Sequence, residues 1–442
     1  MDQEYFESLY PDGARQAEIQ EILGFVKEGK SCQLISVPGV GRSTLLGLLA
    51  YNKNTRLKHL GENQKQTHFV FVNFSEIRKR PLFDAMKFLF LSLADSLRER
   101  ELEDDYLIVN EIFKERLGFG DELVLFQGLK EAMDYLALER KMTIVFLFDR
   151  FEEYVPTVTA EFFTNLRTLR KRAKYRFSVV FSLNRPLEAM LEPQLLADFY
   201  EFVAGNLVAV QLYDEQATRF RIAYIENITG KKLAKKELAG LIQLTGGHGK
   251  LTKLAVELLF SNESKKKDLA AFLLSQKIIR AALLEIWNYL TPAEQTSLLN
   301  GTFEDKELAF YLENVGLIQN NHIKIPLLEQ FIKQEVKEPQ IEKEHIVYDQ
   351  HTNAIIKGAV TLSDQLTSSE FRLLRYMLQN GDRVVERDEL INVVWQGMKS
   401  TAGITDQAVD QLVFRVRRKI EADPNTPAHL QTVKGRGFRL IA

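Results

Sequence analysis

Cysteine and long apolar stretches are both scarce in this sequence. Its 442 residues contain one cysteine, Cys32, which excludes an intramolecular disulfide and a zinc site built from cysteines. This cysteine lies just before a short apolar strand, which predicts a buried structural thiol. No apolar run reaches the ~20 residues that a membrane-spanning helix needs, and the first residues lack a basic and hydrophobic leader. The sequence therefore predicts a cytoplasmic protein that does not contact a membrane.

A large net charge of either sign is also lacking. The 58 lysines and arginines nearly balance the 60 aspartates and glutamates, and the formal net charge is −2. The composition as a whole gives no argument for nucleic acid, so any basic surface must be local. The hydrophobic share of 45% and the charged share of 27% are typical of a globular protein. A chain of this length exceeds one hydrophobic core, which predicts three or four domains.

The strongest local pattern lies in the last hundred residues, where a basic helix precedes a basic hairpin. The predicted helix covers residues 405–420. Its apolar residues Val409, Val413, Val416 and Ile420 recur at steps of four, three and four, which indicates one buried stripe. The other faces carry amides and arginines, which can contact base edges and phosphates. These residues are Gln407, Gln411, Arg415, Arg417 and Arg418.

Two short predicted strands, residues 430–433 and 438–441, flank a glycine-containing turn after this helix. Thr432 lies in the first strand, and Lys434 and Arg436 lie at the tip of the turn. Basic residues outnumber acidic ones between residues 415 and 439, so a DNA-binding surface explains the pattern better than a solvated helix face. Two further helices are predicted upstream, and the first begins at a capping motif that contains Glu370.

Residues 345–442 together resemble the winged-helix effector domain of OmpR/PhoB-type response regulators. The resemblance is carried by Leu366-Thr367 with Glu370, by Arg387-Asp388-Glu389-Leu390 with Trp395, by residues 406–421 and by residues 432–440. In that family the third helix enters the major groove and the wing touches the neighbouring minor groove. The resemblance therefore implies double-stranded DNA as a partner. The residues implied to face DNA are Gln407, Gln411, Arg415, Arg417, Arg418, Thr432, Lys434 and Arg436.

A phosphate-binding loop is predicted near the other end of the chain. An apolar strand over residues 33–36 leads into residues 37–44, and a helix follows. In such a loop, backbone amides surround a pyrophosphate and a hydroxyl holds Mg²⁺. Two positions depart from the pattern G-x-x-x-x-G-K-[ST], because Ser36 replaces the first glycine and Arg42 replaces the lysine. Arginine keeps the charge, although its planar fork does not reproduce a compact ammonium group.

A second apolar strand, residues 142–148, ends at Asp149 in the form of a Walker B segment. Asp149 would support Mg²⁺ together with Ser43. The following position usually holds the carboxylate that activates water, and here it is Arg150. Glu152 or the glutamate after it would have to substitute, although a shift of two residues rarely keeps the geometry. Asp149 and Glu152 are therefore the candidate catalytic residues, while the two motif substitutions argue against efficient hydrolysis and leave a weak ATPase activity open.

Further segments extend the pattern. Arg15 precedes the loop, a strand over residues 177–183 ends at Asn184, and residues 245–249 begin a later helix. Together these resemble the STAND-type or Orc/Cdc6-like branch of the AAA+ ATPases, over about residues 12–261. The resemblance implies ATP or ADP with Mg²⁺. It also implies that Asn184 senses the terminal phosphate and that the helix after Gly247 belongs to a lid that closes on the nucleotide. The implied nucleotide-binding residues are Arg15, Pro38, Gly39, Val40, Gly41, Arg42, Ser43, Thr44, Asp149 and Asn184.

The expected fold is multidomain, α/β plus α+β. A P-loop NTPase domain with a parallel sheet (residues 1–205) is followed by a helical lid (206–278) and a winged-helix-like module (279–333). A charged linker (334–344) then leads to the C-terminal winged helix-turn-helix domain (345–442). The middle module resembles the one that packs on the nucleotide domain in STAND proteins and reports its state.

The leading interpretation is a sequence-specific DNA-binding protein that regulates transcription. Its nucleotide-binding module would act as a conformational or oligomerisation switch, with self-association on DNA as one form of that switch. One alternative is an active ATPase of the replication- or transposition-initiator type. The other alternative is a STAND signalling or defence platform in which DNA binding is secondary.

Overall fold

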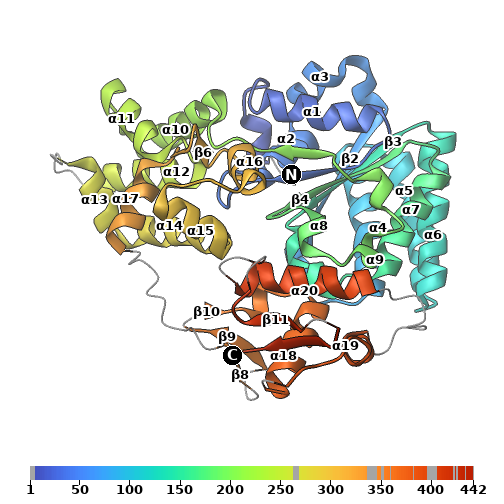
Figure 1. The fold of residues 1–442 in the computed structure, drawn as a ribbon. Coiled ribbons are helices and arrows are strands. Elements are labelled where there is room, and N and C mark those ends of the chain that lie inside the picture. The colour runs from blue at the N-terminus through green and yellow to red at the C-terminus, as the bar shows by residue number, and fades with distance from the viewer. Residues whose placement is uncertain are drawn as a thin grey trace. The chain divides into compact units, whose positions relative to one another are not determined.

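The computed structural model describes residues 5–261, 268–335, 346–349, 353–358, 360–381, 383–395, 406–421, 424, 427–433 and 435–441. The chain divides into two compact units (Figure 1). The first comprises Met1–Ile286 and Ala309–Glu329, and the second comprises Trp287–Leu308 and Gln330–Ala442. Most of the predicted linker, residues 336–344, lies outside the described residues. Among the described residues, no helix combines the length and the apolar character needed to cross a membrane.

A five-stranded parallel sheet forms the centre of the first unit. Its strands are β1 (Cys32–Ile35), β2 (Thr67–Asn73), β3 (Thr143–Asp149), β4 (Phe177–Leu183) and β5 (Leu207–Ala209). They lie in the order β2-β3-β4-β1-β5, and all neighbours are parallel. Nearly every side chain of β1, β3 and β4 is buried, as expected where helices cover both faces of a parallel sheet (Figure 1). The predicted α/β fold is thereby confirmed.

Helices connect these strands and continue beyond them. The helices of the sheet-containing part are α1 (Gln16–Lys27), α2 (Arg42–Tyr51), α3 (Lys53–Leu60), α4 (Leu82–Glu99), α5 (Glu103–Leu117), α6 (Glu122–Asp134), α7 (Ala160–Arg172), α8 (Leu187–Met190) and α9 (Pro193–Leu196). The Cys32 thiol on β1 is fully buried, as predicted, and burial raises its pKa.

An aromatic cluster packs beneath the end of β3. Phe151 is fully buried, with its ring centroid 5.0 Å from that of Phe181 and 5.8 Å from that of Phe148. Because Phe151 is anchored in the core, the short 3₁₀ turn Phe151–Glu153 is held tightly against the sheet. Arg150 and Glu152, the residues before and after Phe151, are therefore held in place by its burial.

The lid predicted after β5 is helical. It consists of α10 (Glu215–Thr229), α11 (Lys235–Thr245), α12 (Gly249–Ser261) and α13 (Leu269–Ser275). The following segment contains α14 (Lys277–Tyr289), α15 (Pro292–Asn300), α16 (Lys306–Asn314) and α17 (Pro326–Glu335), with the hairpin β6 (Ile318–Gln319) and β7 (His322–Ile323) between the last two helices. The sequence predicted helices and a small hairpin in this segment.

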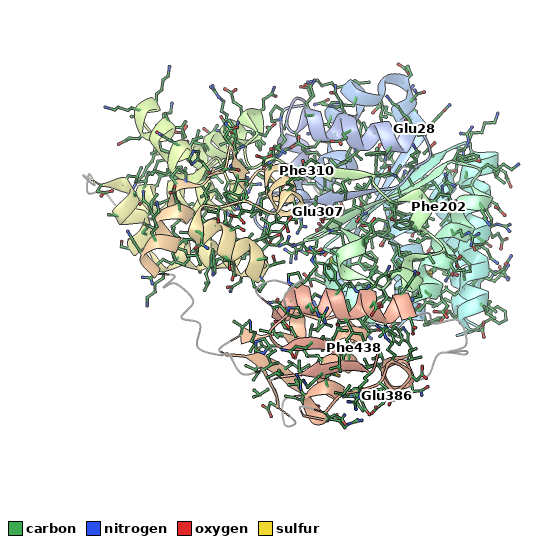
Figure 2. All side chains as sticks on the ribbon, viewed as in Figure 1. Glu28, Phe202, Glu307, Phe310, Glu386 and Phe438 are labelled. Carbon is green, nitrogen blue, oxygen red and sulfur yellow. The ribbon has the colours of Figure 1, made fainter. Side chains whose placement is uncertain are left out.

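The C-terminal domain begins with the antiparallel strands β8 (Ile346–Asp349), β9 (Ala354–Lys357) and β10 (Val360–Thr361). Three helices follow, α18 (Ser368–Gln379), α19 (Arg387–Val394) and α20 (Asp406–Ile420), and then the hairpin β11 (Leu430–Val433) and β12 (Gly437–Leu440). Figure 2 marks Phe438 inside this domain, where it is 1% exposed and bridges to Val385. The order helix, helix, helix, hairpin confirms the predicted winged helix.

Candidate nucleotide site and DNA-binding surface

The predicted phosphate loop connects β1 to α2 at the carboxyl edge of the sheet. Gly39 and Gly41 have φ angles of 83° and 111°, which other residues rarely adopt. Gly41 is the N-cap of α2. The backbone amides at the start of this helix are therefore available to an anion. In an α/β sheet, ligands bind at this edge, outside the carboxyl ends of the strands.

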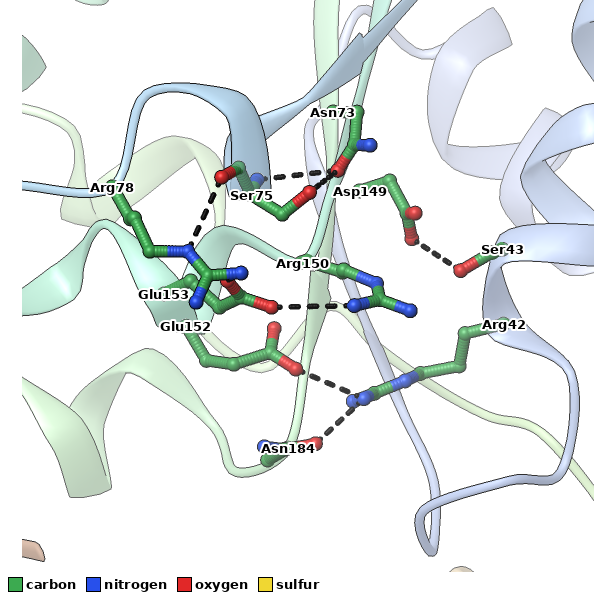
Figure 3. A network of polar contacts seen from close by, with 10 residues as sticks. All are labelled: Arg42, Ser43, Asn73, Ser75, Arg78, Asp149, Arg150, Glu152, Glu153 and Asn184. Carbon is green, nitrogen blue, oxygen red and sulfur yellow. Dashed lines mark hydrogen bonds and ion pairs between the residues drawn. The ribbon is translucent and has the colours of Figure 1, made fainter. Parts of the chain in front are cut away.

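Ser43 and Asp149 meet at this edge, as the sequence predicted for a Mg²⁺-supporting pair. The Ser43 hydroxyl donates a hydrogen bond of 2.9 Å to Asp149 Oδ1 (Figure 3). Asp149 is 3% exposed, and burial raises its pKa, opposed by the Ser43 hydrogen bond and the nearby arginines. A hydroxyl and a carboxylate are oxygen ligands suited to Mg²⁺. These two residues would hold the ion that accompanies a nucleotide phosphate.

Arg42, which stands in the position of the usual lysine, forms contacts within the protein. Its Nη2 donates to Glu152 Oε1 at 3.1 Å and to Asn184 Oδ1 at 2.6 Å (Figure 3). The side chains of Arg42 and Glu152 are 12% and 13% exposed. Burial raises the pKa of Glu152, opposed by the charge of Arg42. The sequence placed these three residues at one site, but it did not predict that Arg42 contacts both Glu152 and Asn184 directly.

Figure 3 shows Arg150 next to this network, linked to Glu153. Its side chain is 55% exposed and forms an ion pair with Glu153 at 3.4 Å, while Arg78 pairs with the other oxygen of Glu153 at 2.7 Å. Arg150 has a left-handed backbone with φ of 52°. Neither Arg150 nor Glu153 contacts Arg42 in the part of the chain that the structure describes. The position that usually activates water therefore carries a partly exposed cation.

A cavity of about 260 Å³ lies between the phosphate loop and the lid. Its lining includes glycines of the loop and the basic lid residues Arg221, Lys250 and Lys253. The complete lining is Tyr10, Arg15, Gly39, Val40, Gly41, Thr44, Ala217, Thr218, Arg221, Ile222, Gly247, Gly249, Lys250, Thr252 and Lys253. This volume approaches the ~300 Å³ at the lower end of small-molecule pockets. Glycine-lined backbone beside lysine and arginine suits an anionic ligand.

Arg15 lines the cavity and also joins the loop to the strand region behind it. Its Nη1 donates to Glu18 at 3.0 Å and to the Gln211 carbonyl at 2.6 Å, and its Nη2 donates to the Val40 carbonyl at 3.1 Å. The residue is 6% exposed. Arg15, which the resemblance implies to bind nucleotide, therefore also positions the phosphate loop.

The lid docks directly on the phosphate loop through His248, a residue that the sequence prediction left out. His248 Nε2 lies 2.7 Å from the Pro38 carbonyl, and the Leu251 amide donates to Nδ1 at 3.3 Å. The geometry assigns the proton to Nε2. The Lys250 amide donates to the Gly39 carbonyl at 3.0 Å. A Cβ on Gly39 would lie 2.8 Å from the His248 ring, so glycine permits this close approach.

In the C-terminal domain, α20 divides its side chains between a buried and an exposed face. Val409, Val413, Val416 and Ile420 are at most 1% exposed, as predicted, and Leu412 is also buried. The exposed residues Gln407, Gln411, Phe414 and Arg418 follow steps of four, three and four along the helix. They form one continuous stripe, which we call the reading stripe. Phe414, 42% exposed, was not predicted, because an aromatic residue on an amphipathic helix usually belongs to the core.

Two of the predicted DNA-facing arginines have partners inside the domain. Arg415 Nε lies 3.5 Å from Oε1 of the fully buried Glu370, and Lys419 pairs with the other oxygen of that carboxylate. Arg417 donates to the Leu430 carbonyl at 2.8 Å and to Thr432 Oγ1 at 2.7 Å. These contacts attach α20 to α18 and to the wing.

Of the two basic residues that were predicted to contact DNA from the wing, the structure describes only Arg436. Arg436 is exposed at the turn between β11 and β12, and Thr432 is exposed on β11 beside Arg417. Lys434 lies outside the described residues. The start of β11 is fixed by Glu421, whose carboxylate accepts hydrogen bonds from the amides of Ala428, His429 and Leu430.

Comparison with known proteins places a family match on this last domain. Residues 363–440 match the family described as transcriptional regulatory protein, C terminal. Sensory transduction protein RegX3 of Mycobacterium tuberculosis is 45% identical over 75 residues, which cover 17% of this chain and 32% of that protein. Transcriptional regulatory protein KdpE of the same species is 31% identical over 108 residues, 24% of this chain and 46% of that protein. The chain therefore spans a third to a half of these relatives, and the shared part is an OmpR-type winged-helix domain.

Solved structures resemble larger parts of the chain at low identity. The Walker-type ATPase of Pyrococcus abyssi covers 75% of this chain and 98% of its own, with 12% identity and a TM-score of 0.44. Cdc6p of Pyrobaculum aerophilum covers 76% of this chain and 97% of its own, with 13% identity and a TM-score of 0.34. Likenesses this weak support no functional conclusion, so the nucleotide site rests on its own geometry.

Proposed function

We propose that this chain is a sequence-specific DNA-binding transcription regulator whose nucleotide site controls how the C-terminal domain is presented to DNA. The observation that carries the proposal is the winged-helix domain with its exposed reading stripe on α20. Amides at Gln407 and Gln411 suit hydrogen bonds to base edges, and Arg418 suits a phosphate or guanine. Phe414 between them suits the methyl group of thymine.

Support for a nucleotide as the controlling ligand comes from the cavity beside the phosphate loop. The loop offers glycine backbone, the Ser43 and Asp149 pair suits Mg²⁺, and the lid adds Lys250 and Lys253 to the cavity wall. These groups fit ATP or ADP with Mg²⁺. The ion would supply positive charge to the phosphates, while the chain's own residues bind and orient the nucleotide.

Support for coupling comes from contacts between α16 and the strand ends of the nucleotide domain. The Arg185 guanidinium stacks 4.6 Å from the centre of the Tyr311 ring, and the Tyr311 hydroxyl donates to the Asn184 carbonyl at 3.4 Å. Gln211 Nε2 donates to the Asn314 carbonyl at 3.1 Å. Asn184 thus contacts both Arg42 and α16, and α16 precedes the DNA-binding domain in the chain. A nucleotide that binds one arrangement of these groups more tightly than another would shift the population of that arrangement.

The test begins with the purified full chain, from which any copurifying nucleotide is identified by mass spectrometry. DNA is then selected from a random duplex pool, and affinity for the selected duplex is measured with no nucleotide, with ADP·Mg²⁺ and with ATP·Mg²⁺. We expect selection of a defined sequence and a change of about fivefold or more in affinity between nucleotide states, the lower end of usual allosteric coupling. Selection of no sequence, or equal affinity in all states, would contradict the proposal.

A second candidate function is an active ATPase, which the intact hydrogen bond between Ser43 and Asp149 favours. Against it, the position after Asp149 is Arg150, which pairs with Glu153, and the Glu152 carboxylate is held by Arg42. Sustained phosphate release by the purified chain, abolished in Asp149→Ala, would establish this function. We expect turnover far below the usual enzymatic range of about 1–10³ s⁻¹.

Self-association belongs to the same proposal as one way in which a nucleotide would control DNA binding. Sedimentation of the full chain with ADP·Mg²⁺ and with ATP·Mg²⁺, each with and without the selected duplex, separates two forms of the switch. A larger species formed on DNA in one nucleotide state indicates an oligomerisation switch. A monomer throughout, combined with altered DNA affinity, indicates a conformational one.

A further inference from the structure

The contacts of Arg42 leave an incomplete polar network in a buried place. Arg42 Nη2 serves both Glu152 and Asn184, while Arg42 Nη1 and Glu152 Oε2 are buried without a hydrogen-bond partner among the described residues. A buried polar atom without a partner is costly, so this network is sensitive to any further charge that a ligand brings near it. The sequence distance between Arg42 and Glu152, 110 residues, shows that the sheet topology creates this pair.

The network lies on the Mg²⁺ side of the phosphate loop. Arg42 is the first residue of α2 and adjoins Ser43, which donates to Asp149. Asn184 follows β4, the strand between β1 and β3, so it lies between the loop and the Walker B end. The cavity reaches the loop through Gly39, Gly41 and Thr44, and its wall does not include Arg42, Glu152 or Asn184 among the described residues. A nucleotide seated on the loop from the cavity would direct its terminal phosphate toward this network.

We propose that Glu152 is a specificity-determining residue. Its carboxylate takes the position next to Arg42 that the terminal phosphate of a triphosphate would otherwise take, so the site prefers a nucleoside diphosphate to a triphosphate. The inference rests on the proposed nucleotide binding and deepens it. A triphosphate would bring negative charge toward a buried carboxylate, and Arg42 can serve the terminal phosphate only if it leaves Glu152. A diphosphate leaves the ion pair between Arg42 and Glu152 intact.

The charge of Glu152 is the property under test, and Glu153 provides a matched control. Glutamine at position 152 keeps the size of the side chain and its hydrogen bonding, but it removes the repulsion and weakens the hold on Arg42. Glu153 is the neighbouring glutamate, and it pairs with Arg78 and Arg150, whose side chains are 58% and 55% exposed, and not with Arg42. Glu153→Gln therefore changes the same charge nearby without touching Arg42.

The experiment is calorimetric titration of the nucleotide-free full chain with ADP·Mg²⁺ and with ATP·Mg²⁺. For the natural sequence we expect ADP to bind about tenfold more tightly than ATP, the scale of one charge-assisted contact. Glu152→Gln should tighten ATP binding about tenfold and change ADP binding less than about twofold. Glu153→Gln should leave the ratio of the two affinities unchanged.

Several outcomes would overturn the inference. ATP binding as tightly as ADP to the natural sequence contradicts it without any variant, and so does an unchanged affinity ratio in Glu152→Gln. If Glu152→Gln does not fold, as judged by thermal unfolding, Glu152→Ala replaces it, because it also removes the charge, and it should shift the ratio in the same direction. If neither nucleotide binds the natural sequence, both this inference and the proposed nucleotide switch fail. If both bind equally, the switch stands and only the role of Glu152 is rejected.

Discussion

Glu370 joins two helices of the C-terminal domain through a fully buried carboxylate. Oε2 accepts the Thr367 amide at 2.8 Å in a capping box at the start of α18, and the same carboxylate pairs with Arg415 and Lys419 on α20. Arg415 is 17% exposed and Lys419 19%. One acidic side chain therefore neutralises two cations on the side of α20 that faces its own domain, and leaves the reading stripe to contact other molecules.

We predict that Glu370→Gln lowers the free energy of unfolding of the C-terminal domain by about 3 kcal/mol, because it leaves two shielded cations without their counter-charge. Glutamine retains the capping box. Urea unfolding followed by the fluorescence of the buried Trp395 would measure the change. Glu386→Gln is the control, since Glu386 is exposed and its side chain makes no capping bond. An equal effect of the two substitutions would contradict the assigned role.

Phe414 is the residue of the reading stripe for which DNA binding makes the clearest prediction. We expect Phe414→Ala to weaken binding to a selected duplex about tenfold, because contacts that discriminate one base contribute about 1–3 kcal/mol. Stability should change little, since the ring is 42% exposed. Competition assays with substituted duplexes should show relaxed preference at one or two base pairs.

Arg418→Ala serves as the comparison for Phe414→Ala. It should weaken binding to all duplexes alike and reduce the dependence of log affinity on log salt by about one unit, as expected for a phosphate contact. If Phe414→Ala and Arg418→Ala both leave DNA binding unchanged, the reading stripe is not the docking face.

At the scale of elements, the position of α12 on the phosphate loop depends on a neutral histidine. His248 is 1% exposed, and burial lowers its pKa to about 4, because the charged imidazole cannot be solvated there. The neutral ring donates to Pro38 and accepts from Leu251. A second proton would have to sit on Nδ1 and would remove the bond from the Leu251 amide. Lid docking is thus tied to the unprotonated form.

The sign of the pH dependence follows from these two pKa values. The unfolded chain takes up a proton at His248 below the ordinary value near 6.5, whereas the folded chain does so only near 4. Between these values the unfolded state binds more protons, so stability falls as the pH falls, by roughly 3 kcal/mol over the whole window. The full stability from this group is present above pH 6.5.

Urea unfolding of the first unit at pH 4.5 and pH 7.0 measures this dependence. His248→Gln is the matched variant, because its amide can contact the same two backbone groups without titrating. We expect the variant to lose a large part of the pH dependence in this window, while the contribution of the buried His68, whose pKa is also lowered by burial, remains in both proteins. Equal pH dependence of the two proteins would contradict the assignment.

At the scale of the whole molecule, the proposed control of DNA binding requires that the nucleotide site and α16 remain connected. Tyr311 contacts both Asn184 and Arg185, whereas its neighbour Phe310 is 65% exposed (Figure 2). We predict that Tyr311→Ala leaves nucleotide affinity within about twofold and reduces the nucleotide-dependent change in DNA affinity by at least half, a loss within the usual range of coupling energies.

Phe310→Ala is the control, because it removes an aromatic ring of the same helix that has no contact with the strand ends in the described structure. The measurement is the ratio of DNA affinities with ADP·Mg²⁺ and ATP·Mg²⁺ for each variant. A ratio that Tyr311→Ala leaves unchanged would show that α16 does not transmit the nucleotide state.

The sequence alone determined those features that depend on neighbours in the chain. The buried stripe of α20 follows from apolar spacing, the start of α18 from its capping box, and the phosphate loop from glycines between a strand and a helix. Each is set by backbone geometry over a few residues. Ordered sets of such motifs, together with the two family resemblances, therefore predicted both the parallel sheet domain and the winged helix.

Only the tertiary structure decided which charged groups meet. Arg42 pairs with Glu152 because the strand order brings the loop after β1 close to the end of β3, across β4. Arg415 pairs with Glu370 because α18 packs against α20, which turns a predicted DNA contact toward the domain's own interior. Helical spacing tells which residues share a face, but it does not tell what that face will pack against. Partners far apart in sequence depend on topology and burial, so the chemistry of the site emerges only from the folded chain.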